Sequence, residues 1–214
     1  MIGPETKLFC IGLSRTGTLS LTKALTMLGV ETVHYPEDPE TQEQLKKGDF
    51  ALSILERAQA LTDIPIAPYY AQLSDRFPGS KFILTTRPTD SWLLSMEKHF
   101  AFYVEHNRTA FGDFVHAAVY GVLHFSRERM AFVKQTHEEG VQRHFASQPG
   151  RLLVFNVFEG DGWPQLCDFL GCAVPSEAFA QEHGVGRSRG TTPGHWMERQ
   201  MAASPPAMRR VRAR

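Results

Sequence analysis

The sequence predicts a three-layer α/β/α fold, in which helices cover both faces of a central parallel β-sheet. Short apolar runs alternate along the chain with longer segments of helical periodicity, an order typical of parallel sheets with crossover helices. Most of these runs are apolar throughout, as strands buried on both faces must be. The length of 214 residues and the hydrophobic content of 42% suit one globular domain.

Strands are predicted where short apolar runs end in turn residues. Four segments meet this description: residues 7–12, 30–35, 81–86 and 151–157. Helices are predicted where apolar residues recur at helical spacing: residues 19–28, 40–47, 51–61, 69–77 and 163–170, and a helix that begins near Pro88. Gly29 and Gly171 are expected to end the first helix and the last one. Residues 100–145 contain no proline and are rich in Phe, Tyr and His, which predicts a helical insertion.

The formal net charge is zero, from 23 basic and 23 acidic side chains, but the charges are unevenly distributed. Seven arginines and one glutamate lie from residue 187 onward, so an acidic body precedes a basic end. We therefore expect one domain over residues 1–184 and a basic, flexible tail over residues 185–214. Zero net charge counts against binding of a long nucleic acid.

The sequence shows no targeting or membrane signal. No run approaches the roughly 18 apolar residues of a membrane span, and residues 1–7 are too short and too polar for a secretory signal. Three cysteines without CxxC spacing, Cys10, Cys167 and Cys172, suit reduced thiols rather than disulfides or a zinc site. These features predict a cytoplasmic protein without a membrane partner.

A glycine-containing loop, Gly12 to Thr18, joins the first predicted strand to the first helix. Backbone N–H groups and the helix dipole can hold a phosphate at such a position. A triphosphatase P-loop needs GxxxxGK[ST], but Thr18 and Leu19 occupy the places of the lysine and the hydroxyl. The loop therefore predicts a phosphate site without the triphosphate and Mg²⁺ machinery, with an ordinary tight turn as the alternative.

The segment Ser14-Arg15-Thr16-Gly17-Thr18 resembles the 5′-phosphosulfate loop of sulfotransferases that use 3′-phosphoadenosine 5′-phosphosulfate (PAPS). The resemblance implies a fold related to P-loop kinases and a basic loop residue, here Arg15, that stabilises the transferring sulfonate. Many relatives have lysine there, and arginine offers a permanent charge and a planar donor fork. By the same resemblance, consecutive residues of the loop and the helix start would bind the cofactor: Ser14, Arg15, Thr16, Gly17, Thr18, Leu19 and Ser20.

A second part of the family pattern follows the strand predicted at 81–86. In sulfotransferases this strand ends in an arginine, a serine lies eight residues later, and both contact the 3′-phosphate. Arg87 and Ser95 have this spacing. An arginine can bind a phosphate through two hydrogen bonds, and ligands of such sheets bind beyond the carboxyl ends of the strands. The resemblance thus implies PAPS as the donor and adenosine 3′,5′-bisphosphate as the product.

Sulfuryl transfer needs a base that takes the proton of the acceptor. Cytosolic sulfotransferases use a histidine in a T-H-x-P-like segment, and the matching segment here, Thr62-Asp63-Ile64-Pro65, has Asp63 at that position. Asp63 is therefore the expected base, with a helix N-cap or an Asx turn as its alternative role. His34, at the end of the second strand, is the alternative base or an acceptor contact. The histidines of the insertion show no HExxH arrangement, so no metal site is expected.

Two looser matches to the family pattern lie later in the chain. Phe158 follows the last strand and either stacks on adenine or belongs to the core. Arg189 and Gly190 either close over the 3′-phosphate, as an Arg/Lys-Gly pair does in the family, or belong to a flexible basic tail.

These residues together predict a PAPS-dependent sulfotransferase that needs no metal. The expected acceptor is a hydroxyl, or an amine, of a small apolar or phenolic molecule covered by the aromatic helices at 100–125. One alternative is a P-loop kinase that phosphorylates a small metabolite with ATP. Another is a protein of the same fold that binds a nucleotide or a partner without catalysis.

Overall fold

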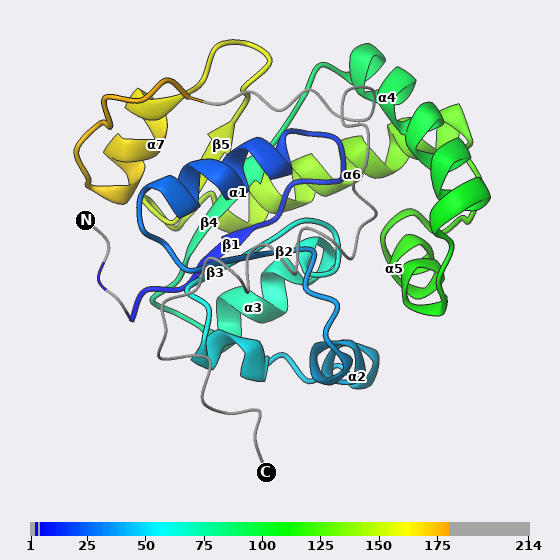
Figure 1. Cartoon of the computed structure of the whole chain (residues 1–214), viewed down its shortest axis with the longest axis horizontal. Helices are drawn as coiled ribbons and strands as arrows, with labels where there is room; N and C mark the ends of the chain where they lie inside the picture. The colour runs from blue at the N-terminus through cyan, green and yellow to red at the C-terminus, as the bar shows by residue number, and fades with distance from the viewer. Residues whose placement is uncertain (1–2, 4, 180–214) are drawn as a thin grey trace. The chain divides into compact units, whose positions relative to one another are not determined.

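The computed structural model describes Gly3 and residues 5–179, and a parallel sheet of five strands lies at its centre (Figure 1). The strands are β1 (Leu8–Cys10), β2 (Thr32–His34), β3 (Ala60–Thr62), β4 (Lys81–Thr85) and β5 (Leu152–Phe155). They lie in the order β2-β3-β1-β4-β5, and each neighbouring pair is parallel. The carboxyl end of β1 therefore lies between those of β3 and β4.

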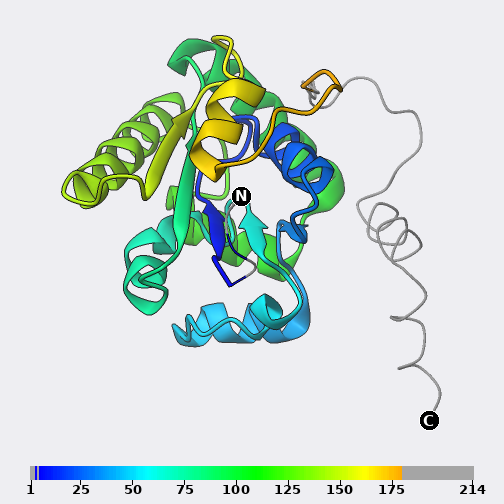
Figure 2. The same cartoon turned by 90° about the vertical axis from the view of Figure 1, so that its left-hand side faces the viewer.

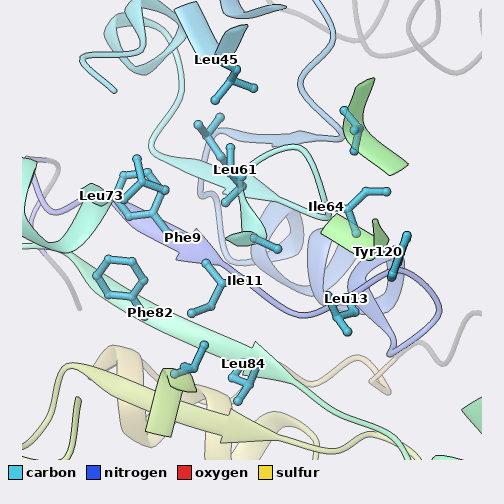
Figure 3. Packing of buried hydrophobic residues seen from close by; sticks show 14 of the residues in the cluster. Phe9, Ile11, Leu13, Leu45, Leu61, Ile64, Leu73, Phe82, Leu84 and Tyr120 are labelled. Carbon is cyan, nitrogen blue, oxygen red and sulfur yellow. The ribbon is translucent and has the colours of Figure 1, made fainter. Parts of the chain in front are cut away.

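Helices cover both faces of the sheet (Figure 2). In the described residues they are α1 (Thr18–Met27), α2 (Pro39–Lys47), α3 (Tyr70–Arg76), α4 (Thr89–Phe102), α5 (Ala110–Tyr120), α6 (Arg127–Phe145) and α7 (Trp163–Leu170). Side chains of α1 and α7 share one buried cluster with Cys10 and Ile83. Side chains of α3, α4 and α6 share the other with Phe9 and Phe82 (Figure 3). Because neighbouring strand residues face opposite sides, β1, β3, β4 and β5 contribute to both cores. The three-layer α/β/α prediction is confirmed.

Most predicted elements are present with small shifts at their ends. All four predicted strands form, and the helix expected near Pro88 begins at Thr89, with Pro88 as its N-cap. The last predicted helix has the expected bounds, and Gly171 ends it with a left-handed φ of 65°. Gly29 follows α1 with a φ of 78°. Glycine adopts this conformation without steric cost, so both helix ends are confirmed.

The helix predicted over residues 51–61 is wrong. Only a short 3-10 helix, η1 (Ser53–Glu56), forms there, and Ala60–Thr62 is strand β3. β3 pairs with β1 on one side and β2 on the other, and all its residues are buried. A short apolar run has too little periodicity to distinguish a strand from a buried helix. The two neighbouring strands, which lie far from it in sequence, decide its conformation.

The helical insertion predicted over residues 100–145 is confirmed and has two parts. The end of α4 continues through a π-helical turn, η3 (Tyr103–Asn107), and α5 follows it beyond the end of the sheet (Figure 1). α6 instead packs on the sheet, where the ring centre of Phe145 lies 4.6 Å from that of Phe82 on β4. Only the end of α4, η3 and α5 therefore extend toward the carboxyl edge.

Among the described residues, no helix is both long and apolar enough to cross a membrane. The predicted boundary between a domain at 1–184 and a tail at 185–214 lies outside the described residues and stays a prediction.

Candidate active site

The loop between β1 and α1 is tightly packed and has unusual backbone angles. A Cβ atom at Gly12 would lie 2.7 Å from the Thr85 carbonyl oxygen and 2.8 Å from Thr16 Oγ1. Gly17, the N-cap of α1, has a φ of 99°, and Arg15 has a φ of 70°. A left-handed arginine is uncommon, so the surrounding contacts must hold Arg15 in place.

Replacing Gly12 by alanine is expected to destabilise the protein. The new methyl group would overlap Thr85 and Thr16, and overpacking of this kind costs about 1–3 kcal/mol. We expect a lower midpoint of urea unfolding with an unchanged m value. Gly79→Ala is the matched control, because nothing lies within 4 Å of a Cβ atom there. Equal midpoints for the two variants would contradict the close packing of Gly12.

Hydrogen bonds from β4 and α4 hold this loop. Thr16 Oγ1 donates to the Leu13 carbonyl oxygen (2.6 Å) and lies 2.7 Å from Thr85 Oγ1, which therefore donates to it. The indole Nε1 of the buried Trp92 donates to the Ser14 carbonyl oxygen at 2.9 Å. These bonds use carbonyl oxygens and side chains of the loop. They do not use its backbone N–H groups, which are the donors that bind an anion in such loops.

Arg15 and Arg87 meet beside the loop although 72 positions separate them in sequence. Arg87 Nη1 donates to the Arg15 carbonyl oxygen at 3.4 Å. Arg15 Nε donates to Ser95 Oγ at 3.0 Å, and Arg87 Nε donates to Ser91 Oγ at 3.0 Å. Two serines one turn apart on α4 therefore orient one guanidinium group each.

The two guanidinium groups make this edge positively charged. Burial lowers the pKa of Arg87, and the charge of Arg15 lowers it further. Burial also lowers the pKa of Arg15, while the charge of Asp63 acts in the opposite direction. Both side chains stay protonated, because arginine does not lose its charge in proteins. A phosphate or sulfonate group would relieve the repulsion between them, so the arrangement suits an anionic ligand.

Phe158 lies at the surface beside Arg87. It is 41% exposed, and the Arg87 guanidinium carbon lies 4.3 Å from the centre of its ring. The interpretation of Phe158 as a core residue is therefore wrong. Its stacking on adenine stays a prediction.

The other predicted cofactor residues lie in the first turn of α1 or outside the described residues. Thr18 and Ser20 are buried, and Leu19 is 42% exposed. All three follow Gly17 at the helix start, where the dipole is positive. Arg189 and Gly190 lie outside the described part of the chain, so their closure over a phosphate stays a prediction.

Asp63 directly follows β3 and faces the phosphate loop. Its φ is 81°, and its Oδ1 accepts hydrogen bonds from Ser14 Oγ at 3.1 Å and from the Ile64 N–H at 2.8 Å. The next helical turn, the 3-10 helix η2 (Ala67–Tyr69), has Ile66 as its N-cap, so Asp63 is not a helix N-cap. An Asx turn is also absent at Asp63, because residue i+2 is Pro65, which has no N–H group. The structure thus places a buried carboxylate beside the loop.

His34, at the end of β2, adjoins this carboxylate. His34 Nε2 lies 3.3 Å from Asp63 Oδ2, so the two candidate bases form one pair. On the other side of the ring, His34 Nδ1 lies 2.8 Å from Thr62 Oγ1. Burial lowers the pKa of His34, and the charge of Asp63 opposes this only in part, so the imidazole is neutral at pH 7.

A row of hydroxyl groups joins His34 to α1. Thr62 Oγ1 lies 2.8 Å from His34 Nδ1 and 2.8 Å from Thr22 Oγ1. On the other side of the ring, the Asp63 carboxylate only accepts, so Nε2 carries the hydrogen of the neutral imidazole. We assign this tautomer from the network, and Nδ1 then accepts from the Thr62 hydroxyl.

Three residues of the site are absent from the sequence-based set. Ser91 orients Arg87, Trp92 anchors the loop at Ser14, and Tyr120 of α5 lies close to the loop (Figure 3). Ser91 was detectable, because it lies one turn before the predicted serine of α4. Trp92 and Tyr120 carry no comparable signal, since a fully buried aromatic residue usually belongs to a core.

Neither a metal cluster nor a disulfide is found among the described residues. No group of three or more His, Cys, Asp or Glu side chains there could hold a metal ion. The cysteines of this part of the chain, Cys10, Cys167 and Cys172, are free thiols. Burial and the neighbouring Cys172 together raise the pKa of Cys167 to about 11.

The parallel sheet, the glycine-containing loop and the arginine after β4 are typical of a three-layer α/β/α protein with a P-loop-like fold. The chain belongs to the sulfotransferase family, because the family model of the sulfotransferase domain matches residues 7–185. It is similar to the Ava biosynthesis cluster protein M of Aspergillus versicolor. The two are 26% identical over 208 residues, which cover 81% of this chain and 79% of that protein.

Proposed function

We propose that this chain transfers the sulfuryl group of PAPS to a hydroxyl, or an amine, of a small molecule. The observation that carries the proposal is the convergence of Arg15 and Arg87, each oriented by a serine of α4. Membership of the sulfotransferase family supports the class of reaction. Two adjacent guanidinium groups suit a donor that carries a 5′-phosphosulfate and a 3′-phosphate.

The residues present fit such a donor. Gly12 and Gly17 let the loop backbone pack closely and turn at the start of α1, and Arg15 would bind the phosphosulfate. Arg87 would bind the 3′-phosphate together with Ser95. Ser91 joins this set, because it is the serine that contacts Arg87 in the structure. When bound, PAPS would supply a sulfuryl group attached to a phosphate leaving group.

The proton of the acceptor passes to Asp63 in this proposal. As the acceptor oxygen forms its bond to sulfur and the bond from sulfur to the phosphate oxygen breaks, Asp63 Oδ2 takes the proton. His34 Nε2, 3.3 Å away, donates to the carboxylate and orients it. Arg15 stabilises the negative charge that develops on the leaving oxygen.

The proposed acceptor is small and aromatic or apolar. Aromatic rings from three segments pair at this end of the molecule: Tyr35 with Phe111 at 6.3 Å, and Phe100 with Tyr120 at 5.6 Å. The name of the fungal relative, a biosynthesis cluster protein, is consistent with a small-molecule acceptor. The free cysteines support a reducing, cytoplasmic location.

A comparison of nucleotides in thermal unfolding tests the donor. We expect adenosine 3′,5′-bisphosphate to raise Tm more than equal concentrations of ADP or ATP, because only it offers a 3′-phosphate to Arg87. Arg87→Ala should remove most of this difference. Arg57→Ala is the control and should retain it, because Arg57 contacts Asp38 and not the loop.

Two other outcomes would contradict the proposal, and each would support a different function. Strong stabilisation by Mg·ATP, with turnover of ATP and none of PAPS, would support a P-loop kinase. Stabilisation by adenosine 3′,5′-bisphosphate without sulfation of any compound in a hydroxyl and amine library would support a nucleotide-binding protein without catalysis.

A further inference from the structure

Four buried side-chain atoms in the described part of the chain lack a hydrogen-bond partner, and three of them lie together. These three are His99 Nε2 on α4, and His116 Nε2 and the Tyr120 hydroxyl on α5. The His116 ring centre lies 5.9 Å from that of His99 and 5.8 Å from that of Tyr120. An unpartnered buried polar atom costs about 1–3 kcal/mol. Three in one place therefore indicate a polar occupant that satisfies them.

The protonation state of His116 determines which hydrogen-bonding group this occupant must have. His116 Nδ1 lies 2.7 Å from the Gly112 carbonyl oxygen, which only accepts, so Nδ1 carries the hydrogen. Burial lowers the pKa of His116, while the bond to Gly112 and the charges of Asp113 and Asp63 act in the opposite direction, so the ring is neutral. Nε2 then presents a lone pair. Only a hydrogen-bond donor satisfies this lone pair, and His116 is buried.

This cluster adjoins the proposed reaction centre. Burial and the charge of Asp63 raise the pKa of Tyr120, whereas Ser14 of the loop lowers it, so the hydroxyl lies beside Ser14, although not in hydrogen-bonding geometry. His116 lies one helical turn before Tyr120. On its other side the Tyr103 ring stacks on His116 at 4.2 Å. The cluster therefore extends from the loop between β1 and α1, through the Tyr120 side chain, to His116.

We propose that His116 binds the sulfuryl acceptor, accepting through Nε2 a hydrogen bond from a second hydroxyl or N–H group. The acceptor is then a small aromatic molecule with a donor at each end. One donor lies near Asp63 and is sulfated, and the other is bound by His116. The inference rests on the proposed function.

Two matched small molecules test in solution whether His116 accepts this hydrogen bond. Hydroquinone has a donor at both ends, whereas 4-methoxyphenol has nearly the same shape and a donor at one end only. Each is added to the protein saturated with adenosine 3′,5′-bisphosphate, in which no transfer can occur, and the ring nitrogens are followed by ¹⁵N NMR of histidine-labelled protein. We expect the His116 Nε2 resonance to lie in the unprotonated range and to move to the hydrogen-bonded range with hydroquinone only.

His116→Phe keeps an aromatic ring and removes the acceptor atom. It is expected to weaken hydroquinone binding about tenfold, the effect of one hydrogen bond, and to leave the affinity for 4-methoxyphenol unchanged. His144→Phe is the matched control. His144 Nε2 is the fourth unpartnered atom, but its ring packs on Tyr70 and Phe145 and not on α5.

The outcomes separate this inference from the proposed function. Equal responses to the two probes, no response to hydroquinone, or a loss in His144→Phe equal to that in His116→Phe would overturn the role of His116. If adenosine 3′,5′-bisphosphate itself neither stabilises the wild-type protein nor competes with PAPS, the proposed function fails instead.

Discussion

Asp63→Asn is expected to lower kcat by about 10²- to 10⁴-fold, the usual contribution of a general base, with little change in nucleotide affinity. An asparagine oxygen can still accept from Ser14 Oγ and the Ile64 N–H, which bond to Asp63 at 3.1 and 2.8 Å. It cannot take a proton from the acceptor. The measurements are kcat with the best acceptor from a phenol screen and calorimetric affinity for adenosine 3′,5′-bisphosphate.

Asp75→Asn is the control for Asp63→Asn, because Asp75 is an exposed carboxylate on α3. It should leave kcat and affinity unchanged. Full activity of Asp63→Asn would exclude Asp63 as the base. A parallel loss of kcat and of nucleotide affinity would instead show that the Asp63 carboxylate mainly holds the loop through Ser14.

Arg15→Ala is expected to lower kcat/KM by about 10²- to 10³-fold, the effect of removing one group that stabilises charge in a transition state. Arg15 has a left-handed backbone, and it is held by Nε donation to Ser95 and by the bond from Arg87 to its carbonyl oxygen. A charge held in this way needs no reorganisation when the leaving oxygen becomes negative. The measurement is kcat/KM for PAPS.

Arg15→Lys separates charge from geometry. Lysine restores the positive charge but not the planar fork or the hydrogen bond to Ser95, so we expect activity between those of Arg15→Ala and the wild-type protein. Arg57→Ala, which removes an arginine outside the site, should behave as wild type. If Arg15→Lys were as inactive as Arg15→Ala, the fork and not the charge would be the essential feature.

The positions of the loop and of Arg87 were predictable because their signals are local. The loop from Gly12 to Thr18 lies between a strand and a helix, and Arg87 follows the most strand-like segment, so neighbouring residues alone place both at one edge. The partners of the arginines were less predictable. Ser95 was expected beside Arg87, but it contacts Arg15 in the structure, and Ser91 contacts Arg87.

The pairing of Asp63 with His34 could not be predicted, because it depends on strand β3. The helix expected at 51–61 would have left β2 and β1 without the strand that lies between them. Once Ala60–Thr62 pairs with both, the residues that follow β2 and β3 become neighbours. The role of His116 could not be predicted for a related reason, since the burial of its Nε2 depends on the packing of α5 and not on any local spacing.

The packing of Gly12 against Thr85 also limits how this protein can evolve. The space that a side chain at position 12 would occupy is filled by the hydroxyl and the carbonyl oxygen of Thr85. A smaller residue at position 85 would remove the hydroxyl but not the carbonyl oxygen, and it would loosen the loop, because that hydroxyl also bonds Thr16. The loop and β4 must therefore change together or not at all. Position 85 should therefore vary little among related proteins, although the Thr85 side chain need not touch the substrate.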